Sequence, residues 1–351
     1  MDDDAWYNLN EDSNLPGKEL LKQAGLFIIN EGNFMYDNAS VSYYSIDSMK
    51  ISNEVFYKVN KVPVGDVAQS MTIRDSLGYI VVNNSSKIYI INVNTFEYLG
   101  KITGLTSPRY IHLISAEKAY VSDLYASAIA IVNPVTMKVT GFIDVHNNTS
   151  AFQQHSTEQM IQIGKEVFTN CWSYDNKILV IDTESDRLVD SITVSIQPNS
   201  MVLDKDQKLW VLCDGGFDGN PYGYGKPALI RIDPETRSAE TILKFALEDN
   251  PRDLVINGTG DTLYYLNRHV YSMPVTAATY PRIKIESSYG QTLVGGYYAL
   301  TVDPYYGDIY VADAIDQVQF GKVYRYSSGG QLLDILSVGI NPGAFCFKEK
   351  K

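Results

Sequence analysis

The stretch SPRYIHLISAEKAYVSDLYASAIAIVNPVTMKVTGFIDV (residues 107–145) contains four short apolar segments that are separated by turns. The first begins after Pro108, and the second, KAYVSD, ends at Asp123. The third, AIAIVN, ends at Asn133, and a four-residue turn leads into the fourth, KVTGFIDV. Segments of this length, rich in β-branched and aromatic residues and bounded by Pro, Asn and Asp, are typical of β-strands. The stretch therefore predicts one four-stranded antiparallel unit.

The first segment of this unit recurs along the whole chain. One apolar position aligns in seven copies, at intervals of 40, 50, 40, 53, 46 and 45 residues, and is occupied by Met71, Ile111, Ile161, Met201, Leu254, Leu300 and Phe345. Second segments such as GYIVVNN, EVFTNC and DIYVAD end in, or next to, a polar residue. An internal period of this size is that of a β-propeller blade, and seven blades form a closed ring.

The two ends of the chain predict how the ring closes. The N-terminal region supplies only the second to fourth strands of its blade, within 26–61, and the missing innermost strand is the C-terminal PGAFCF, 342–347. We therefore predict an all-β, seven-bladed β-propeller over residues 25–348. Residues 1–24 are expected to form an N-terminal tether and 349–351 a C-terminal tail, with helical periodicity only near KELLKQ, 18–23.

The composition excludes several kinds of partner. The 351-residue chain has a formal net charge of −12 and no cluster of Lys and Arg, which argues against nucleic acid and against an anionic membrane surface as partners. No apolar run reaches the roughly 18 residues of a membrane-spanning helix. Cys171, Cys213 and Cys346 lack the spacing of a metal site or a disulfide framework and are expected to be free thiols.

One face of the predicted ring carries the long loops. In this strand order, loops after the second and fourth strands share a face, which we call the aromatic face, and loops after the first and third strands are short. The aromatic residues in its loops are Phe34, Tyr36, Tyr125, Phe152, Trp172, Tyr174, Phe217, Tyr222, Tyr224, Tyr289, Tyr297 and Phe320. Loops on a rigid scaffold are common binding sites, so this face is the predicted ligand site. The alternative is that these side chains fold down and cap the blades.

A ring of mostly polar residues is predicted at the centre of this face. It lies two residues before each aligned apolar position and consists of Gln69, Arg109, Gln159, Asn199, Arg252, Tyr298 and Gly343. Amides and guanidinium groups inside an aromatic rim suit a large amphipathic ligand that bears amides, carboxylates or phosphate. The polar side chains of the ring, together with Tyr298 and the loop aromatics, are therefore the candidate contacts. The alternative is a solvated ring that only satisfies the strand ends.

Catalytic patterns are sparse in the sequence. The four histidines, His112, His146, His155 and His269, show no metal-ligand spacing. His146 and His155 are expected to be surface histidines, with a His/Asp pair as the alternative. DGGFDGN, 214–220, lacks the alternation of a calcium-binding EF-hand loop, and no phosphate loop or Gly-x-Ser-x-Gly elbow occurs. We therefore predict no catalytic residue, no metal and no cofactor.

Two repeats carry a resemblance to known families. AYVSDLYASAIAIVNPVTMKVTGFIDV and VFTNCWSYDNKILVIDTESDRLVDSITV resemble the repeats of YVTN/YncE-like propellers over about 25–348. The long aromatic loops and the acidic start are similar to the BtuG type of surface lipoprotein propeller from gut Bacteroidetes. That resemblance implies capture of cobalamin and related corrinoids, and transfer to a TonB-dependent outer-membrane transporter of the BtuB type.

The same resemblance implies a location. Asp2, Asp3 and Asp4 match the acidic export signal of these lipoproteins if Met1 stands in place of the lipidated cysteine. The protein would then lie on the cell surface, held to the outer membrane only through an N-terminal lipid anchor. A periplasmic location is the alternative.

Two other function classes remain open at this point. One is a propeller hydrolase or lyase with a metal in the axial channel, for which Glu158, Asn199 and Asp253 are the candidate ligands. The other is a platform for protein–protein interaction, such as a lid on a transporter, and it is compatible with ligand capture.

Overall fold

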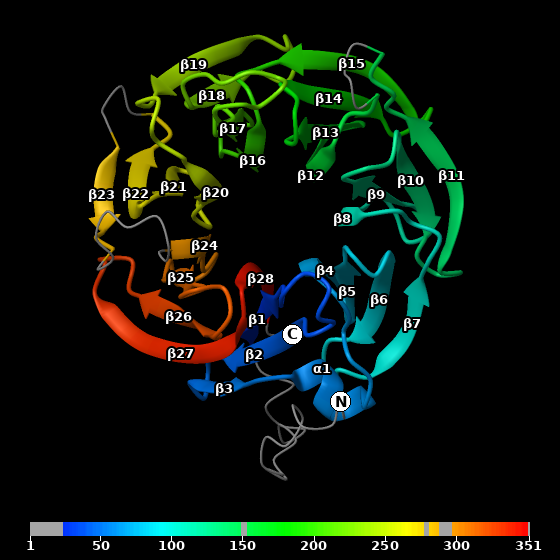
Figure 1. Cartoon of the computed structure of the whole chain (residues 1–351), viewed down its shortest axis with the longest axis vertical. Coiled ribbons are helices and arrows are strands. Elements are labelled where there is room, and N and C mark those ends of the chain that lie inside the picture. Colours follow the sequence, from blue (N-terminus) through cyan, green and yellow to red (C-terminus); the bar gives the residue numbers. More distant parts are fainter. Residues whose placement is uncertain (1–23, 149–152, 277–280, 288–296, 350–351) are drawn as a thin grey trace.

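Seven four-stranded antiparallel sheets surround a central axis in the computed structural model of the protein (Figure 1). The structure describes residues 24–148, 153–276, 281–287 and 297–349. The sequence-based prediction of an all-β, seven-bladed β-propeller is confirmed, and each blade runs from an innermost strand at the axis to an outermost strand at the rim.

The blades follow one another in chain order. The first blade contains β28 (Pro342–Lys348), β1 (Gly25–Asn30), β2 (Ser40–Ser45) and β3 (Lys50–Ser52). The second contains β4 (Ala68–Arg74), β5 (Leu77–Val82), β6 (Lys87–Asn92) and β7 (Tyr98–Ile102). The third contains β8 (Pro108–Leu113), β9 (Ala119–Asp123), β10 (Ala128–Asn133) and β11 (Lys138–Asp144). The fourth contains β12 (Thr157–Ile163), β13 (Glu166–Cys171), β14 (Lys177–Asp182) and β15 (Arg187–Thr193).

The remaining three blades repeat this order. The fifth contains β16 (Pro198–Leu203), β17 (Leu209–Cys213), β18 (Ala228–Ile232) and β19 (Ala239–Lys244). The sixth contains β20 (Arg252–Ile256), β21 (Thr262–Asn267), β22 (His269–Pro274) and β23 (Arg282–Ile285). The seventh contains β24 (Tyr297–Val302), β25 (Ile309–Asp313), β26 (Phe320–Tyr326) and β27 (Leu332–Ile340).

The first blade differs from its predicted form. Its outermost strand, β3, has only three residues, and the helix α1 (Val55–Asn60) follows where the sequence was expected to continue as strand. Val55 and Phe56 are buried and pack in the core shared by the first two blades. Burial of this apolar pair outweighs the weak strand pattern around it. The predicted helix near 18–23 lies outside the described residues.

The core lies between neighbouring blades. All residues of the second strands β1, β9, β17 and β25 are buried, whereas the outermost strands β11 and β15 expose most of their residues. In one such interface, Val81 and Ile88 of the second blade pack in a cluster with Ile111 and Val121 of the third. The three cysteines are free thiols, as predicted. Among the described residues, no helix has the length and apolar character needed to cross a membrane.

The ring closes through a strand pair between the two ends of the chain. β28 pairs antiparallel with β1, from Gly25 opposite Lys348 to Ile29 opposite Ala344. The prediction that 342–347 completes the first blade is therefore confirmed. Backbone hydrogen bonds hold the two chain ends together, and β28 also packs beside the innermost strands of both neighbouring blades, β4 and β24.

This closure gives a first prediction. Deletion of 342–351 removes β28, leaves the backbone groups of β1 unpaired and opens the ring, so the thermal midpoint should fall steeply or the protein should not fold. Deletion of 350–351 alone removes no strand residue and serves as the control. Circular dichroism during heating makes the comparison, and equal midpoints for the two truncated proteins would contradict the closure mechanism.

Candidate ligand-binding face and axial channel

The loops of the aromatic face leave six aromatic side chains exposed. They are between 43% and 75% exposed, and they are Phe34, Tyr36, Tyr125, Phe217, Tyr224 and Phe320. Each lies between the second and third strands of a blade or at the start of the third strand, so all six belong to one face of the ring. On the opposite face, Tyr305 and Tyr306 are exposed in the loop between β24 and β25.

Other predicted contact residues are partly or fully packed. Trp172 is half-buried, and its indole Nε1 donates a hydrogen bond to Asp214 Oδ2 at 2.8 Å. Tyr222 is half-buried and donates its hydroxyl to Asn176 Oδ1 at 2.9 Å. These two residues therefore anchor the loops, which corresponds to the alternative reading of the aromatic set.

Tyr174 and Tyr297 occupy different environments. The ring of Tyr174 is half-buried and contacts the ring of Phe217 edge-on, with 6.4 Å between centroids. Tyr297 is buried in the core between the sixth and seventh blades, where its hydroxyl lies 3.1 Å from the hydroxyl of Tyr326. Tyr297 is thus a packing residue. It is the first residue of β24, and the strand directs its side chain between the sheets. Phe152 and Tyr289 lie outside the described residues.

The polar ring links each blade to the next one. Gln159 Oε1 accepts the backbone N–H of Met201 at 2.8 Å, and Asn199 Nδ2 donates to the carbonyl of Pro251 at 2.8 Å. Both bonds cross from one innermost strand to the neighbouring blade. These two side chains therefore satisfy backbone groups of the next blade and join neighbouring blades around the axis.

Arg109 forms the most buried ion pair of the channel. Its Nε lies 2.8 Å from Glu158 Oε1 and 2.9 Å from Oε2, and its second nitrogen donates to Gln69 Oε1 at 2.5 Å. The Glu158 side chain is only 4% exposed. Burial raises the pKa of Glu158, while the Arg109 guanidinium opposes that rise. Arg109 thus connects three consecutive blades.

Glu31 also lies in this channel, although it was not among the predicted site residues. Tyr298 donates its hydroxyl to Glu31 Oε2 at 2.7 Å, and the guanidinium of Arg252 lies 5.7 Å from the centre of the Tyr298 ring. Burial raises the pKa of Glu31, and Tyr298, Arg109 and Arg252 oppose the rise. A Cβ at Gly343 would overlap the Glu31 carboxylate. In the sequence, the glycine at position 343 of the polar ring was the only sign that the side chain of another residue occupies that part of the channel.

Asp253 is the third acid of the channel. Its Oδ2 is buried and has no hydrogen-bond partner among the described residues. Burial raises the pKa of the Asp253 carboxyl to about 7, and the Arg252 guanidinium opposes the rise while Glu31 adds to it. The channel therefore holds three carboxyl groups and two guanidinium groups in a low-dielectric environment, where each group depends on its neighbours for charge compensation.

Two of the three candidate metal ligands of the channel, Glu158 and Asn199, are committed to other contacts. The Glu158 carboxylate is held by Arg109, and Asn199 is hydrogen-bonded to Pro251 and Ser200. In the described part of the chain, one group of three His, Cys, Asp or Glu side chains is close enough together to hold a metal ion, and it contains neither Glu158 nor Asp253.

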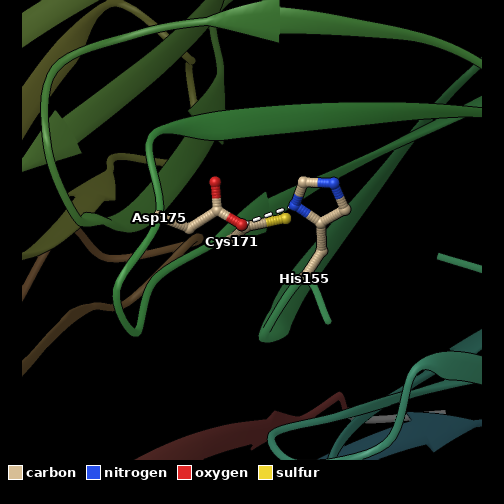
Figure 2. Close-up of side chains that lie close together, drawn as sticks. All are labelled: His155, Cys171 and Asp175. Atoms are coloured by element: carbon tan, nitrogen blue, oxygen red, sulfur yellow. Dashed lines mark hydrogen bonds and ion pairs between the residues drawn. The ribbon is translucent and has the colours of Figure 1, made fainter. Parts of the chain in front are cut away.

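The clustered group lies instead beneath the loop that joins β13 and β14. It consists of His155, Cys171 and Asp175, whose ligand atoms all lie within 4.8 Å of one another (Figure 2). His155 Nδ1 is 2.5 Å from Asp175 Oδ2, and the two side chains are only 12% and 1% exposed. The expectation of a surface histidine is wrong for His155, because the loop returns against β13 and brings the imidazole onto a buried carboxylate.

A hollow of about 360 Å³ lies on the opposite face between the fifth and sixth blades. Four of its charged side chains already pair with one another, since Lys208 Nζ lies 2.6 Å from Asp233 Oδ2 and Arg231 lies 2.6 Å from Glu240 Oε2. No predicted site residue lines it. We therefore place the candidate site on the aromatic face.

Comparison with known proteins supports the fold and leaves the activity open. Residues 24–338 match the model of a family described as a domain of unknown function, DUF5074. The chain belongs to this family. No curated protein matches the chain. The family and the curated proteins therefore do not indicate an activity for the chain.

Solved structures similar to this DUF5074 chain are propellers from several bacteria. A quinoprotein alcohol dehydrogenase-like protein from Bacteroides thetaiotaomicron has a TM-score of 0.69 at 13% identity, over 93% of this chain and 78% of that chain. The periplasmic gluconolactonase of Pseudomonas aeruginosa has a TM-score of 0.68 at 10% identity, over 93% and 99%. Hydrazine synthase of Kuenenia stuttgartiensis has a TM-score of 0.62 at 15% identity, over 79% and 88%. At these identities the likeness shows the fold alone.

The Arg109–Glu158 pair gives a second prediction. Arg109→Met leaves the buried Glu158 carboxylate without its cation and should lower the free energy of unfolding by about 3–5 kcal/mol. The double variant Arg109→Met/Glu158→Gln removes the uncompensated charge and should lose clearly less. Urea unfolding of the three proteins measures this difference, and equal losses in the single and double variants would show that the ion pair is not the cause.

Asp253 gives a third prediction, on pH dependence. Because its pKa is about 3.8 in the unfolded chain and about 7 when folded, the folded state binds the proton more tightly. The free energy of unfolding should therefore fall as the pH rises from about 4 through about 7. In the Asp253→Asn variant, the free energy of unfolding should fall less steeply over this pH range. At about pH 8 the variant should be more stable than the wild type. Asn tolerates the left-handed backbone at this position, where φ is 54°.

A carboxylate with the opposite shift provides the control for that experiment. Asp316 is exposed, and hydrogen bonds, led by that from the Gln319 side chain, lower its pKa to about 2. Asp316→Asn should leave the slope between pH 5 and 8 unchanged. A slope that is identical in wild type and Asp253→Asn would contradict the assignment.

Proposed function

We propose that this protein is a non-catalytic binding protein that captures a corrinoid-sized ligand, with cobalamin as the leading candidate, on the aromatic face. The observation that carries the proposal is the set of six exposed aromatic side chains on one face of a rigid ring, around a channel mouth lined by amides and guanidinium groups. Exposed aromatic groups gathered on one surface commonly mark a site that a partner covers.

The chemistry of the face suits a large ligand with apolar faces and polar edges. Aromatic rings such as Tyr125 and Phe217 offer flat apolar surface, and each can bury about 150–250 Å² against a partner. At the centre, Arg252 donates to the carbonyl of Tyr297 at 2.5 Å, which leaves most of its five N–H donors for other acceptors. Amide and phosphate oxygens of a ligand are suitable acceptors for those donors.

The contacts within the channel explain why we propose capture and no bond chemistry. Arg109 binds Glu158 and Tyr298 binds Glu31, and these contacts hold the floor of the face rigid. A rigid floor reduces the entropy lost on binding. Within this proposal the ring residues Gln69, Arg109, Gln159, Asn199, Arg252 and Tyr298 form the floor, and the exposed aromatics form the rim.

The location and the partner are proposed from the resemblance of the sequence. The acidic start, Asp2 to Asp4, fits a lipid-anchored protein on the outer-membrane surface, and the captured corrinoid would pass to a TonB-dependent transporter of the BtuB type. Exposed rim residues that the ligand leaves uncovered would then contact the transporter. Co-purification of the transporter from outer membranes, and its loss in the rim variants, would support this step.

The binding proposal leads to a fourth prediction. Calorimetric titration with cobalamin should show one site, and Tyr125→Ala and Phe217→Ala should each weaken binding about 30-fold if they act as central aromatic contacts. Tyr305→Ala and Tyr306→Ala, which remove exposed aromatics from the opposite face, should leave the affinity unchanged. Absence of binding at micromolar concentration for cobalamin and for other corrinoids would refute the proposed ligand class. Equal weakening by variants on both faces would refute the proposed site.

A further inference from the structure

The group beneath the β13–β14 loop combines three different kinds of ligand atom. His155 precedes β12, Cys171 is the last residue of β13, and Asp175 lies in the loop that follows. An imidazole nitrogen, a thiol sulfur and a carboxylate oxygen thus meet within 4.8 Å (Figure 2). In the view of Figure 2, the Cys171 sulfur appears next to the line that joins His155 Nδ1 and Asp175.

The backbone around the group is fixed by hydrogen bonds from several elements. His155 N donates to the carbonyl of Val145 at 3.2 Å, and Trp172 N donates to the carbonyl of Ser156 at 3.1 Å. The carbonyl of Asp175 accepts Gln197 N at 2.8 Å. These backbone hydrogen bonds hold the side chains of His155, Cys171 and Asp175 close together, in addition to the direct contact between His155 and Asp175.

We propose that His155, Cys171 and Asp175 bind one Zn²⁺ ion. Cys, His and Asp are all common zinc ligands, and three protein ligands with one open position form a standard tetrahedral arrangement. With zinc bonds of about 2.0–2.1 Å to nitrogen and oxygen, the Nδ1–Oδ2 separation would rise from 2.5 Å to about 3.3 Å.

The charges also favour a divalent cation. A thiolate and a carboxylate neutralise Zn²⁺, so the buried assembly carries no net charge, which lowers the cost of keeping it out of water. On binding, the Cys171 thiol releases its proton to solvent and the sulfur–zinc bond forms, while His155 supplies a neutral nitrogen lone pair. Without the ion, burial and the neighbouring carboxylate of Asp175 raise the pKa of the Cys171 thiol well above its usual value. The fourth position would be taken by water on the side where His155 is partly exposed.

The fifth blade contains the same framework without the site. Thr157 faces Cys171 in the fourth blade as Pro198 faces Cys213 in the fifth, so the two cysteines occupy equivalent positions. By the same register, Ile196 replaces His155, and Phe217 replaces Asp175 by its distance from the cysteine. Cys213 is equally buried. A core thiol at this position therefore needs neither the histidine nor the aspartate, and their presence in the fourth blade calls for another reason.

A bound ion would stabilise part of the aromatic face. It would connect the segment before β12, the end of β13 and the β13–β14 loop, which carries Trp172 and Tyr174 between the ligands. The inference does not depend on the proposed corrinoid ligand, because the three ligands and their test involve only this chain and the metal.

Cobalt substitution tests the site. Protein without a polyhistidine tag, treated with EDTA and kept reduced, is titrated with Co²⁺ and then with Zn²⁺. We expect one Co²⁺ per chain, a near-ultraviolet sulfur-to-cobalt charge-transfer band, visible bands of tetrahedral intensity, and loss of all of them when Zn²⁺ is added. Zinc should also raise the thermal midpoint, because an ion that binds only the folded state stabilises it.

Matched variants separate the site from adventitious binding. Cys171→Ser should abolish the charge-transfer band, whereas Cys213→Ser should keep it. His155→Gln and Asp175→Asn should weaken Co²⁺ binding at least tenfold, and His146→Gln, which changes a histidine of the same loop, should not. If Cys171→Ser fails to fold by circular dichroism, His155→Gln against His146→Gln decides the question. Three results would overturn the proposal. They are the absence of a charge-transfer band in the wild type, a band that persists in folded Cys171→Ser, and equal Co²⁺ binding by the two histidine variants.

Discussion

The antiparallel pairing of β28 with β1 is the interaction on which the rest of the structure depends. It joins residues more than 300 positions apart and makes the first blade four-stranded, so that every blade has a neighbour on both sides. Without it, the first and seventh blades would expose the apolar faces that now pack against each other. Leu26 and Ile28 belong to the face of the first blade, and Tyr310 and Val338 to that of the seventh. The ring is thus cooperative, since each blade buries its core only against the next.

A closed ring forces seven innermost strands to meet around one axis, and their side chains must share that space. The chain resolves this crowding with an ion pair and hydrogen bonds between neighbouring blades, as in the contacts of Arg109 with Glu158 and of Tyr298 with Glu31. Acids buried there retain their protons to higher pH than in water. Polar groups near the axis therefore act first as connections between blades, and any ligand meets a floor that is already organised.

The rigid ring leaves the loops free to carry other chemistry. The loops between the second and third strands carry both exposed residues, such as Tyr125 and Phe217, and packed ones, such as Trp172. The same freedom allows one loop to bring Asp175 over the end of β13, where Cys171 and His155 complete a cluster that the neighbouring blade lacks.

The repeat, the number of blades and the closure by 342–347 were determined by the sequence alone, because strand periodicity and turn residues are local signals that recur at a regular interval. The direction of each strand also followed, and with it the division into an aromatic face and an opposite face. Only the tertiary structure decided which aromatics are exposed and which are packed: Tyr297 and Phe320 both stand where a strand of the seventh blade begins, yet one is 6% and the other 57% exposed. It also placed Glu31 in the channel, Val55 and Phe56 on a helix, and His155 on Asp175. The reason is physical, since these outcomes depend on contacts between residues distant in sequence, and no local pattern records which neighbours will bury a side chain.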